Sequence, residues 1–285
     1  MEFITCIYNG LHDTNFGGSL NRDRHYMFSL KSISAIKEKI TCYIGEKDLE
    51  TCKNYFENSG IENIILEKFD LTNFEHHLNV KKIRENDRQY SDVGWNNRCI
   101  EIMWGKIWWM FDHFKDKDDD YKIFWIDAGL SHGGIFPKKY NKIFQLKKNL
   151  TYEEAFQFDK IFNTNFVKWI DSFSDNGPFF METTQPQYPY PDKYKIYKKL
   201  DTSIIRGLFG GKKKDMMPIL EEFMLISKEL INNNELLREE QILTVIYNKF
   251  PEKFNTIKFN TWYHEDWDCY DKTLTPFSNF VTNYV

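Results

Sequence analysis

The sequence predicts an α/β fold, in which a mixed, mostly parallel sheet is flanked by helices within a single domain. Two observations support this fold class. Strand-like and helix-like segments alternate through residues 3–66, and such alternation is typical of a parallel sheet covered by helices. Later in the chain, the apolar run of residues 123–126, Ile-Phe-Trp-Ile, lies between a charged block and several glycines. This short run predicts a buried central strand.

The amino-terminal part supplies most of the regular pattern. We expect strands at residues 3–8, 41–45 and 61–66, and helices at 26–40, 48–58 and 96–114. Gly60 directly follows the second of these helices, at the position where a glycine commonly ends a helix. Apolar side chains recur at helical spacing through 96–114, which predicts that one face of this helix is buried.

The carboxyl-terminal part is less regular. We expect a helix from Thr151, a long ordered loop over 173–192, a strand near 203–206 that runs into a tight glycine turn, and helices up to Leu230 and over 236–247. The aromatic residues of the loop either line an acceptor site or pin the loop to the core, and the sequence leaves both interpretations open.

Composition excludes several classes of protein. With 38 basic and 42 acidic residues and no basic stripe, nothing indicates a nucleic-acid partner. The five cysteines are scattered and lack Cys-x-x-Cys spacing, which argues for a reducing compartment and against a disulfide framework or zinc site. No signal peptide and no apolar run of about 18 residues is found. We therefore expect a cytoplasmic protein with at most peripheral attachment to the inner membrane face.

Asp127 is the first candidate for a functional role, because it follows the predicted central strand directly. Ligands of open α/β sheets bind beyond the carboxyl ends of the strands. The small residues after Asp127, up to Gly134, would let a ligand approach. The alternative is an aspartate that only stabilises a turn through its own backbone.

Three further segments complete the candidate site, namely Gly207–Gly211, the pair Glu239 and Glu240, and His264. An aspartate with a histidine suits a divalent cation such as Mn²⁺ or Mg²⁺, which would stabilise the charge on a leaving diphosphate. Each member also has a structural alternative. The glycines would form only a turn, the glutamates a solvated helix edge, and the histidine a hydrogen-bonded structural contact.

Basic residues in the same regions are candidate phosphate ligands. Lys106, Arg22 and Arg24 would add positive charge against phosphate oxygens, and Gly210 and Gly211 would let the backbone come close to a cofactor. The segment Gly17–Arg24 matches neither a dinucleotide-binding fingerprint nor a phosphate-binding P-loop, and no Gly-x-Ser-x-Gly hydrolase motif occurs.

Several short motifs resemble the HtrL/YibB family. They are WIDAGLSH at 125–132, GLFGG at 207–211, EEQILT at 239–244, and a late block with Trp262 and His264. That family is similar to GT-A-type glycosyltransferases of bacterial surface polysaccharides. The resemblance implies a GT-A-like, Rossmann-like fold, with a nucleotide-sugar-binding half at 1–134 and an acceptor and catalytic half at 135–285. It also implies transfer of a hexose from a nucleotide diphosphate sugar, with UDP expected, to a glycan or lipid-linked acceptor.

The resemblance assigns roles residue by residue. Asp127 would be the first acid of a DxD-like metal motif, but Gly129 stands where the second acid is expected. This departure either removes the metal dependence or leaves Asp127 and His264 to bind Mn²⁺ or Mg²⁺. Glu240, with Glu239 beside it, matches the catalytic acid of the helix motif. It would act as a general base in direct displacement or orient the sugar in a retaining reaction.

Two other functions stay open at this point. The first is a metal-dependent phosphotransferase or hydrolase that uses the same aspartate. The second is a carbohydrate-binding protein without turnover, suggested by eight tryptophans and sixteen tyrosines, although aromatic residues more simply pack a core.

Overall fold

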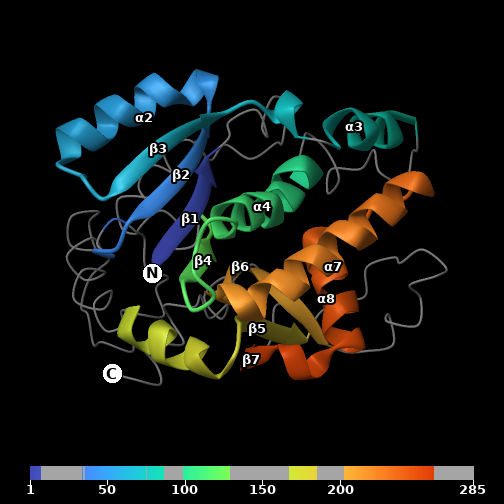
Figure 1. Cartoon of the computed structure of the whole chain (residues 1–285). Coiled ribbons are helices and arrows are strands. Elements are labelled where there is room, and N and C mark those ends of the chain that lie inside the picture. Colours follow the sequence, from blue (N-terminus) through green and yellow to red (C-terminus); the bar gives the residue numbers. More distant parts are fainter. Residues whose placement is uncertain are drawn as a thin grey trace, which may run out of the picture.

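A computed structural model describes residues 1–7, 34, 36–74, 76–86, 99–128, 167–184 and 202–259 (Figure 1). In these ranges one seven-stranded sheet has the order β3-β2-β1-β4-β6-β5-β7. Its strands are β1 (Glu2–Ile7), β2 (Ile40–Gly45), β3 (Ile64–Phe69), β4 (Lys122–Ile126), β5 (Phe179–Thr184), β6 (Thr202–Lys212) and β7 (Asn255–Phe259). Strand β6 runs antiparallel to both of its neighbours, and the remaining pairs are parallel. The prediction of a mixed, mostly parallel sheet is confirmed.

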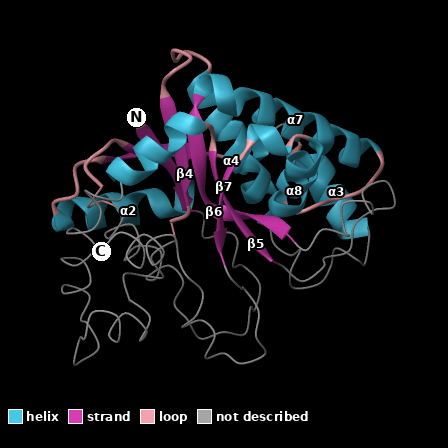
Figure 2. Cartoon of the chain, turned by 90° about the horizontal axis from the view of Figure 1, so that it is seen from below, coloured by secondary structure: helices cyan, strands magenta, loops and turns pink. Residues whose placement is uncertain are grey.

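Helices cover both faces of the sheet (Figure 2). The helices are α2 (Glu46–Ser59), α3 (His77–Asn86), α4 (Cys99–Phe114), α7 (Lys213–Asn232) and α8 (Glu239–Lys249), with a further helical segment at 167–173. Short 3-10 turns are η2 (Leu71–Asn73), η5 (Ser174–Asn176) and η7 (Pro251–Lys253). Helices α3, α4, α7 and α8 pack on one core, while α2 and 167–173 pack on the other.

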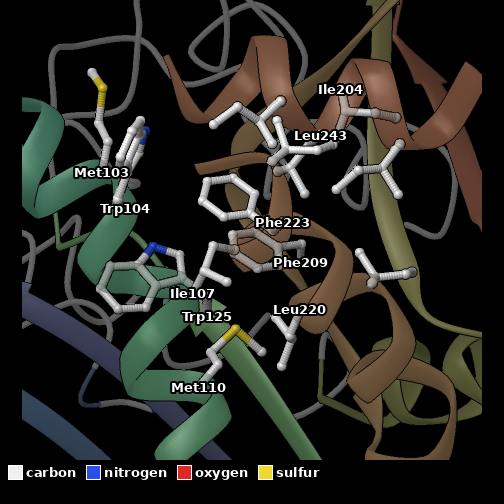
Figure 3. Close-up of a cluster of buried hydrophobic side chains, with 14 of the residues drawn as sticks. Met103, Trp104, Ile107, Met110, Trp125, Ile204, Phe209, Leu220, Phe223 and Leu243 are labelled. Atoms are coloured by element: carbon white, nitrogen blue, oxygen red, sulfur yellow. The ribbon is translucent and has the colours of Figure 1, made fainter. Parts of the chain in front are cut away.

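Strand β4 contributes to both cores, because successive side chains of a strand point to opposite faces. Ile123 and Trp125 join the core under α4, α7 and α8, where Figure 3 labels Trp125. Phe124 and Ile126 join the core under α2. All four side chains are buried. An apolar run without alternation is therefore required here, which is why the sequence predicts this strand well.

The glycines of β6 differ from the expectation. We predicted a strand that runs into a tight glycine turn, and this was wrong, because β6 continues through Gly210 and Gly211 to Lys212. A Cβ atom on Gly210 would lie 2.6 Å from the Cα of Phe124, and one on Gly211 would lie 2.9 Å from the Cα of Pro178. Both glycines have φ near the edge of the left-handed range, at 155° and 157°. They allow neighbouring backbones to pack closely.

Other elements confirm or shift the predicted boundaries. Gly60 ends α2 with φ 64° in the left-handed region, as expected. Strand β3 begins at Ile64 rather than residue 61, and the predicted helix of 26–40 cannot reach its expected end because Ile40 begins β2. The predicted helix from Thr151 lies outside the described residues.

The expected loop over 173–192 contains a strand, β5, so that prediction was wrong in this part. Phe179 and Phe180 are both fully buried in β5. For Phe179 and Phe180, packing in the core is therefore the interpretation observed, whereas the tyrosines at 188 and 190 lie outside the described residues. The short strand β7, which pairs with β5, was not predicted.

Candidate functional site

Asp127 lies where the strand order of the sheet reverses. From β1 the chain moves outward to β2 and β3, and then returns to place β4 on the other side of β1. Asp127 follows β4 directly, and its backbone N–H donates to the carbonyl of Gly207 in β6 at 2.8 Å. The backbone of this residue is therefore fixed by the sheet. The carboxyl ends of strands at such a reversal are the usual ligand site of open α/β sheets.

Strand alternation decides which way Asp127 faces. It has the same parity along the chain as Trp125, whose side chain lies in the core under α4. The two side chains meet there, since the indole N–H of Trp125 donates to Oδ1 of Asp127 at 2.6 Å. Trp109 of α4 stacks against Trp125 with ring planes 13° apart. The tryptophan is thus held rigidly, and it holds the carboxylate in turn.

Lys106 of α4 joins two carboxylates. Its Nζ lies 2.8 Å from Oδ1 of Asp127 and 2.8 Å from Oε1 of Glu239. The lysine side chain is only 7% exposed, that of Glu239 is 1% exposed, and that of Asp127 is 31% exposed. Asp127 is therefore the most accessible member of the three. The ammonium also lies 5.3 Å from the ring centre of Trp125, within the range of a cation–π contact.

The position of Lys106 follows from the helix period. It lies one turn from both Met103 and Met110, which are buried. The methylene groups of Lys106 therefore lie on the apolar face of the helix, and its ammonium lies beyond them at the edge of the sheet. A lysine enclosed in this way needs charged partners, because burying an unpaired charge is costly. Asp127 and Glu239 supply them.

The first turn of α8 delivers the second carboxylate. The indole N–H of Trp104 donates to the carbonyl of Leu237 at 3.0 Å, which ties the chain just before α8 to α4. The backbone N–H of Arg238 donates to the side chain of Gln241 at 2.9 Å, and the carbonyl of Arg238 accepts from the N–H of Gln241 at 3.0 Å, so these two residues hold the start of the helix. Glu239 then enters the helix against Lys106. Negative side chains are favourable in this turn because of the helix dipole.

Glu239 and Glu240 are both buried, at 1% and 7% exposure. The alternative of a solvated helix edge is therefore wrong. Glu240 lies beside Glu239, and its carbonyl accepts a hydrogen bond from the Thr244 hydroxyl at 2.6 Å. That hydroxyl also accepts from the N–H of Ile204 in β6 at 3.1 Å. The start of α8 is thus attached both to α4 and to the sheet.

Cys6, near the end of β1, was not among the predicted site residues. Its thiol has a pKa raised well above the ordinary value, mainly by removal from water and further by Cys42 and by Asp127, with Lys106 acting in the opposite direction. The thiol is therefore neutral at physiological pH and is a poor nucleophile. Cys6 belongs to this region only because it lies close to the cluster, and the sequence does not reveal that proximity.

The structure brings together three of the predicted site residues, Asp127, Lys106 and Glu239, with Glu240 adjacent. Gly210 and Gly211 are not among them: they pair with Phe124 and Ile123 toward the start of β4, away from Asp127 at its end. Three other predicted residues, Arg22, Arg24 and His264, lie outside the described ranges.

The described part of the site does not fit a divalent cation. Asp127 and Glu239 direct one oxygen each at the same ammonium, and that oxygen of Asp127 also accepts from Trp125. Within the described ranges no group of three or more His, Cys, Asp or Glu side chains is placed to hold a metal. The expected metal role of His264 stays a prediction.

Comparisons with known proteins identify no family for this chain. No protein-family model matches the chain, and no curated protein matches its sequence, so the resemblance to HtrL/YibB stays a prediction. Among solved structures, the chain is similar to a 4-diphosphocytidyl-2C-methyl-D-erythritol synthase from Anaerococcus prevotii, with 13% identity, a TM-score of 0.42, and coverage of 99% of this chain and 95% of that one. A similarity this low assigns no activity to the chain.

None of the helices in the described ranges combines the length and the apolar character needed to cross a membrane.

Proposed function

We propose that this chain is a glycosyltransferase that moves a hexose from a nucleotide diphosphate sugar to a glycan or surface-polysaccharide acceptor, with a UDP-linked hexose as the expected donor. The supporting observation is the joined cluster of Asp127, Lys106 and Glu239 beyond the end of β4. It lies at the strand-order reversal, where open α/β sheets bind ligands. The motif resemblance adds the reaction class.

The cluster suits hydroxyl groups better than phosphates. One ammonium faces two carboxylates, so the three groups together carry a net negative charge. Carboxylate oxygens accept hydrogen bonds from sugar hydroxyls, and Asp127 is the most exposed of the three. Lys106 was expected to bind phosphate, but its charge is directed to the carboxylates. We therefore expect Arg22 and Arg24 to bind the diphosphate.

The proposed reaction is a direct displacement at the anomeric carbon. The acceptor oxygen forms a bond to that carbon while the bond to the nucleotide diphosphate breaks, and the acceptor proton passes to Glu240 as general base. Glu239 is less suited to this role, because its carboxylate is bonded to Lys106 at 2.8 Å. In a retaining reaction Glu240 would instead orient the sugar or the acceptor.

Ligand binding is the first property to test. A thermal-shift panel of nucleotides and nucleotide sugars is measured on the native protein, because ligands that bind only the folded state raise the unfolding temperature. We expect a shift with UDP and UDP-hexoses. Asp127→Asn should weaken the binding by about 10- to 100-fold, the loss expected for one hydrogen bond to a charged group.

Asp175→Asn is the matched control. Asp175 also contacts a lysine, since its Oδ1 lies 2.8 Å from Nζ of Lys122, but it lies near the opposite end of β4. This variant should bind the donor as the native protein does. Equal loss in both variants, or native activity in a folded Asp127→Asn variant, would contradict the site assignment.

Product analysis then separates the reaction classes. Release of nucleotide diphosphate together with a glycosylated acceptor supports the transferase, whereas release of free phosphate indicates a phosphotransferase or hydrolase. Absence of any nucleotide-dependent shift would favour a carbohydrate-binding protein.

A further inference from the structure

We propose that Lys106 is a tethered cation that takes the place of a divalent metal between Asp127 and Glu239, so that this site binds its ligand without a metal ion. The proposal relies on the proposed function only for the identity of the ligand, because its main test uses metal alone. It rests on the position of the lysine and on the groups that surround it.

The position is defined by two distances. Nζ of Lys106 lies 2.8 Å from Oδ1 of Asp127 and 2.8 Å from Oε1 of Glu239, so these two oxygens converge on one point. A divalent ion held by the same two carboxylates would occupy that point. Because the ammonium already fills this point, an ion would have to displace the side chain of Lys106. That side chain is only 7% exposed.

The donor set supports the same conclusion. Mg²⁺ requires a near-octahedral shell of oxygen ligands, and Mn²⁺ also favours oxygen donors. The described ranges provide two carboxylates here and no third metal-ligating side chain grouped with them. Oδ1 of Asp127 is further occupied by the indole N–H of Trp125 at 2.6 Å. One fixed monovalent charge satisfies these two oxygens, whereas a divalent ion would need additional water ligands in the space that the lysine side chain fills.

Burial explains why a cation is required at this point. Glu239 is 1% exposed, and a buried carboxylate without a partner is strongly unfavourable. If the ammonium were removed and its space left open, the two carboxylates would face a small volume without the charge that now lies between them. Such a site should attract a divalent ion. Lys106→Ala is therefore expected to gain metal binding that the native protein lacks.

The test measures Mn²⁺ binding to the full chain by electron paramagnetic resonance of free Mn²⁺, without any nucleotide. For the native protein we expect no binding that depends on Asp127, so native protein and Asp127→Asn should give the same titration. Lys106→Ala should bind Mn²⁺ more tightly than the native protein by about ten-fold or more, because the repulsion from a fixed positive charge at this point is removed. The double variant Lys106→Ala/Asp127→Asn should lose this gain.

Lys122 provides a matched control elsewhere in the structure. Its Nζ also lies between two carboxylates, 2.7 Å from Asp171 and 2.8 Å from Asp175, but these side chains are 51% and 57% exposed. In addition, Lys212 remains 3.1 Å from Asp175. Lys122→Ala should therefore gain no Mn²⁺ binding. An equal gain in Lys122→Ala and Lys106→Ala would overturn the proposal, because the effect would not be specific to the buried pair.

Two other results would also overturn it. One is Mn²⁺ binding by the native protein that Asp127→Asn abolishes, and this comparison decides the matter even if Lys106→Ala does not fold. The other is a folded Lys106→Ala variant that gains no Mn²⁺ binding. Chelation with EDTA should leave the thermal shift caused by a nucleotide sugar unchanged. If no nucleotide sugar causes a shift, the proposed transferase function fails, while the Mn²⁺ titrations still decide the role of Lys106.

Discussion

Replacing Lys106 by methionine should lower the folding stability, and the loss should come mainly from Glu239 and less from Asp127. Methionine keeps most of the volume of the lysine stem but removes the charge. Glu239 is then left 1% exposed without its ammonium partner at 2.8 Å, whereas Asp127 keeps its access to water. Removing one member of a buried ion pair costs about 3–5 kcal/mol of folding free energy. We expect a loss in this range for Lys106→Met.

Two single substitutions chosen for comparison should cost less folding free energy. Asp127→Asn leaves Lys106 paired with Glu239 and should cost about 1 kcal/mol, the value of a typical hydrogen bond. Lys122→Met removes an ammonium from two half-exposed carboxylates and should cost at most about 1 kcal/mol, as surface ion pairs do. The double variant Lys106→Met/Glu239→Gln should recover part of the loss, because no buried charge is then left unpaired.

Urea denaturation followed by tryptophan fluorescence measures these differences, since the buried Trp104 and Trp125 lie in the core next to the cluster. A double-mutant cycle of Lys106 and Glu239 isolates their interaction, with a coupling of about 2–3 kcal/mol expected for contacting residues. A loss in Lys106→Met no larger than that in Lys122→Met would refute the assignment of Lys106 to a buried pair. So would additive effects of Lys106→Met and Glu239→Gln.

Two further predictions concern the framework. Gly210→Ala would place a Cβ 2.6 Å from the Cα of Phe124 at a φ of 155°, so strain and overpacking together should cost about 2–5 kcal/mol. An unchanged unfolding temperature would contradict the observed strand contact. Tyr247 has a pKa raised above its ordinary value by burial and by Glu182. The native state therefore holds the phenolic proton more tightly, and this stability, complete below about pH 10, is lost as pH rises through the native pKa. Tyr247→Phe should make the alkaline loss of stability less steep, and an unchanged slope would contradict this assignment.

The local parts of the site could be predicted from the sequence. Residues 123–126 are apolar without alternation because β4 is buried on both faces, and this pattern fixed the position of Asp127 at a strand end. The pair Glu239 and Glu240 was also placed in a helix with a buried side, although the helix was expected from residue 236 and begins at Glu239. In each case the information lies within a few consecutive residues.

The contacts between distant residues could not be predicted. Lys106 and Glu239 are 133 positions apart, and nothing in the sequence near either residue predicts a contact with the other. The glycines of β6 were misjudged for the same reason, because the need for Gly210 comes from the backbone of Phe124 in another strand. Strand β5 was missed since the turn-forming residues around it outweighed its own six-residue signal.

The long span between Lys106 and Glu239 also has a consequence for synthesis of the protein. At about 5–20 residues per second, the ribosome adds Glu239 roughly 7–27 s after Lys106, given the 133 positions between them. For much of that interval β6 (Thr202–Lys212), the antiparallel neighbour of β4, has not yet been made, and until Glu239 is added the lysine has only Asp127 as a partner among the three charged groups of the cluster. The nascent chain therefore presents an open strand edge that β6 closes only later, and the cluster is complete only after α8 has begun to emerge.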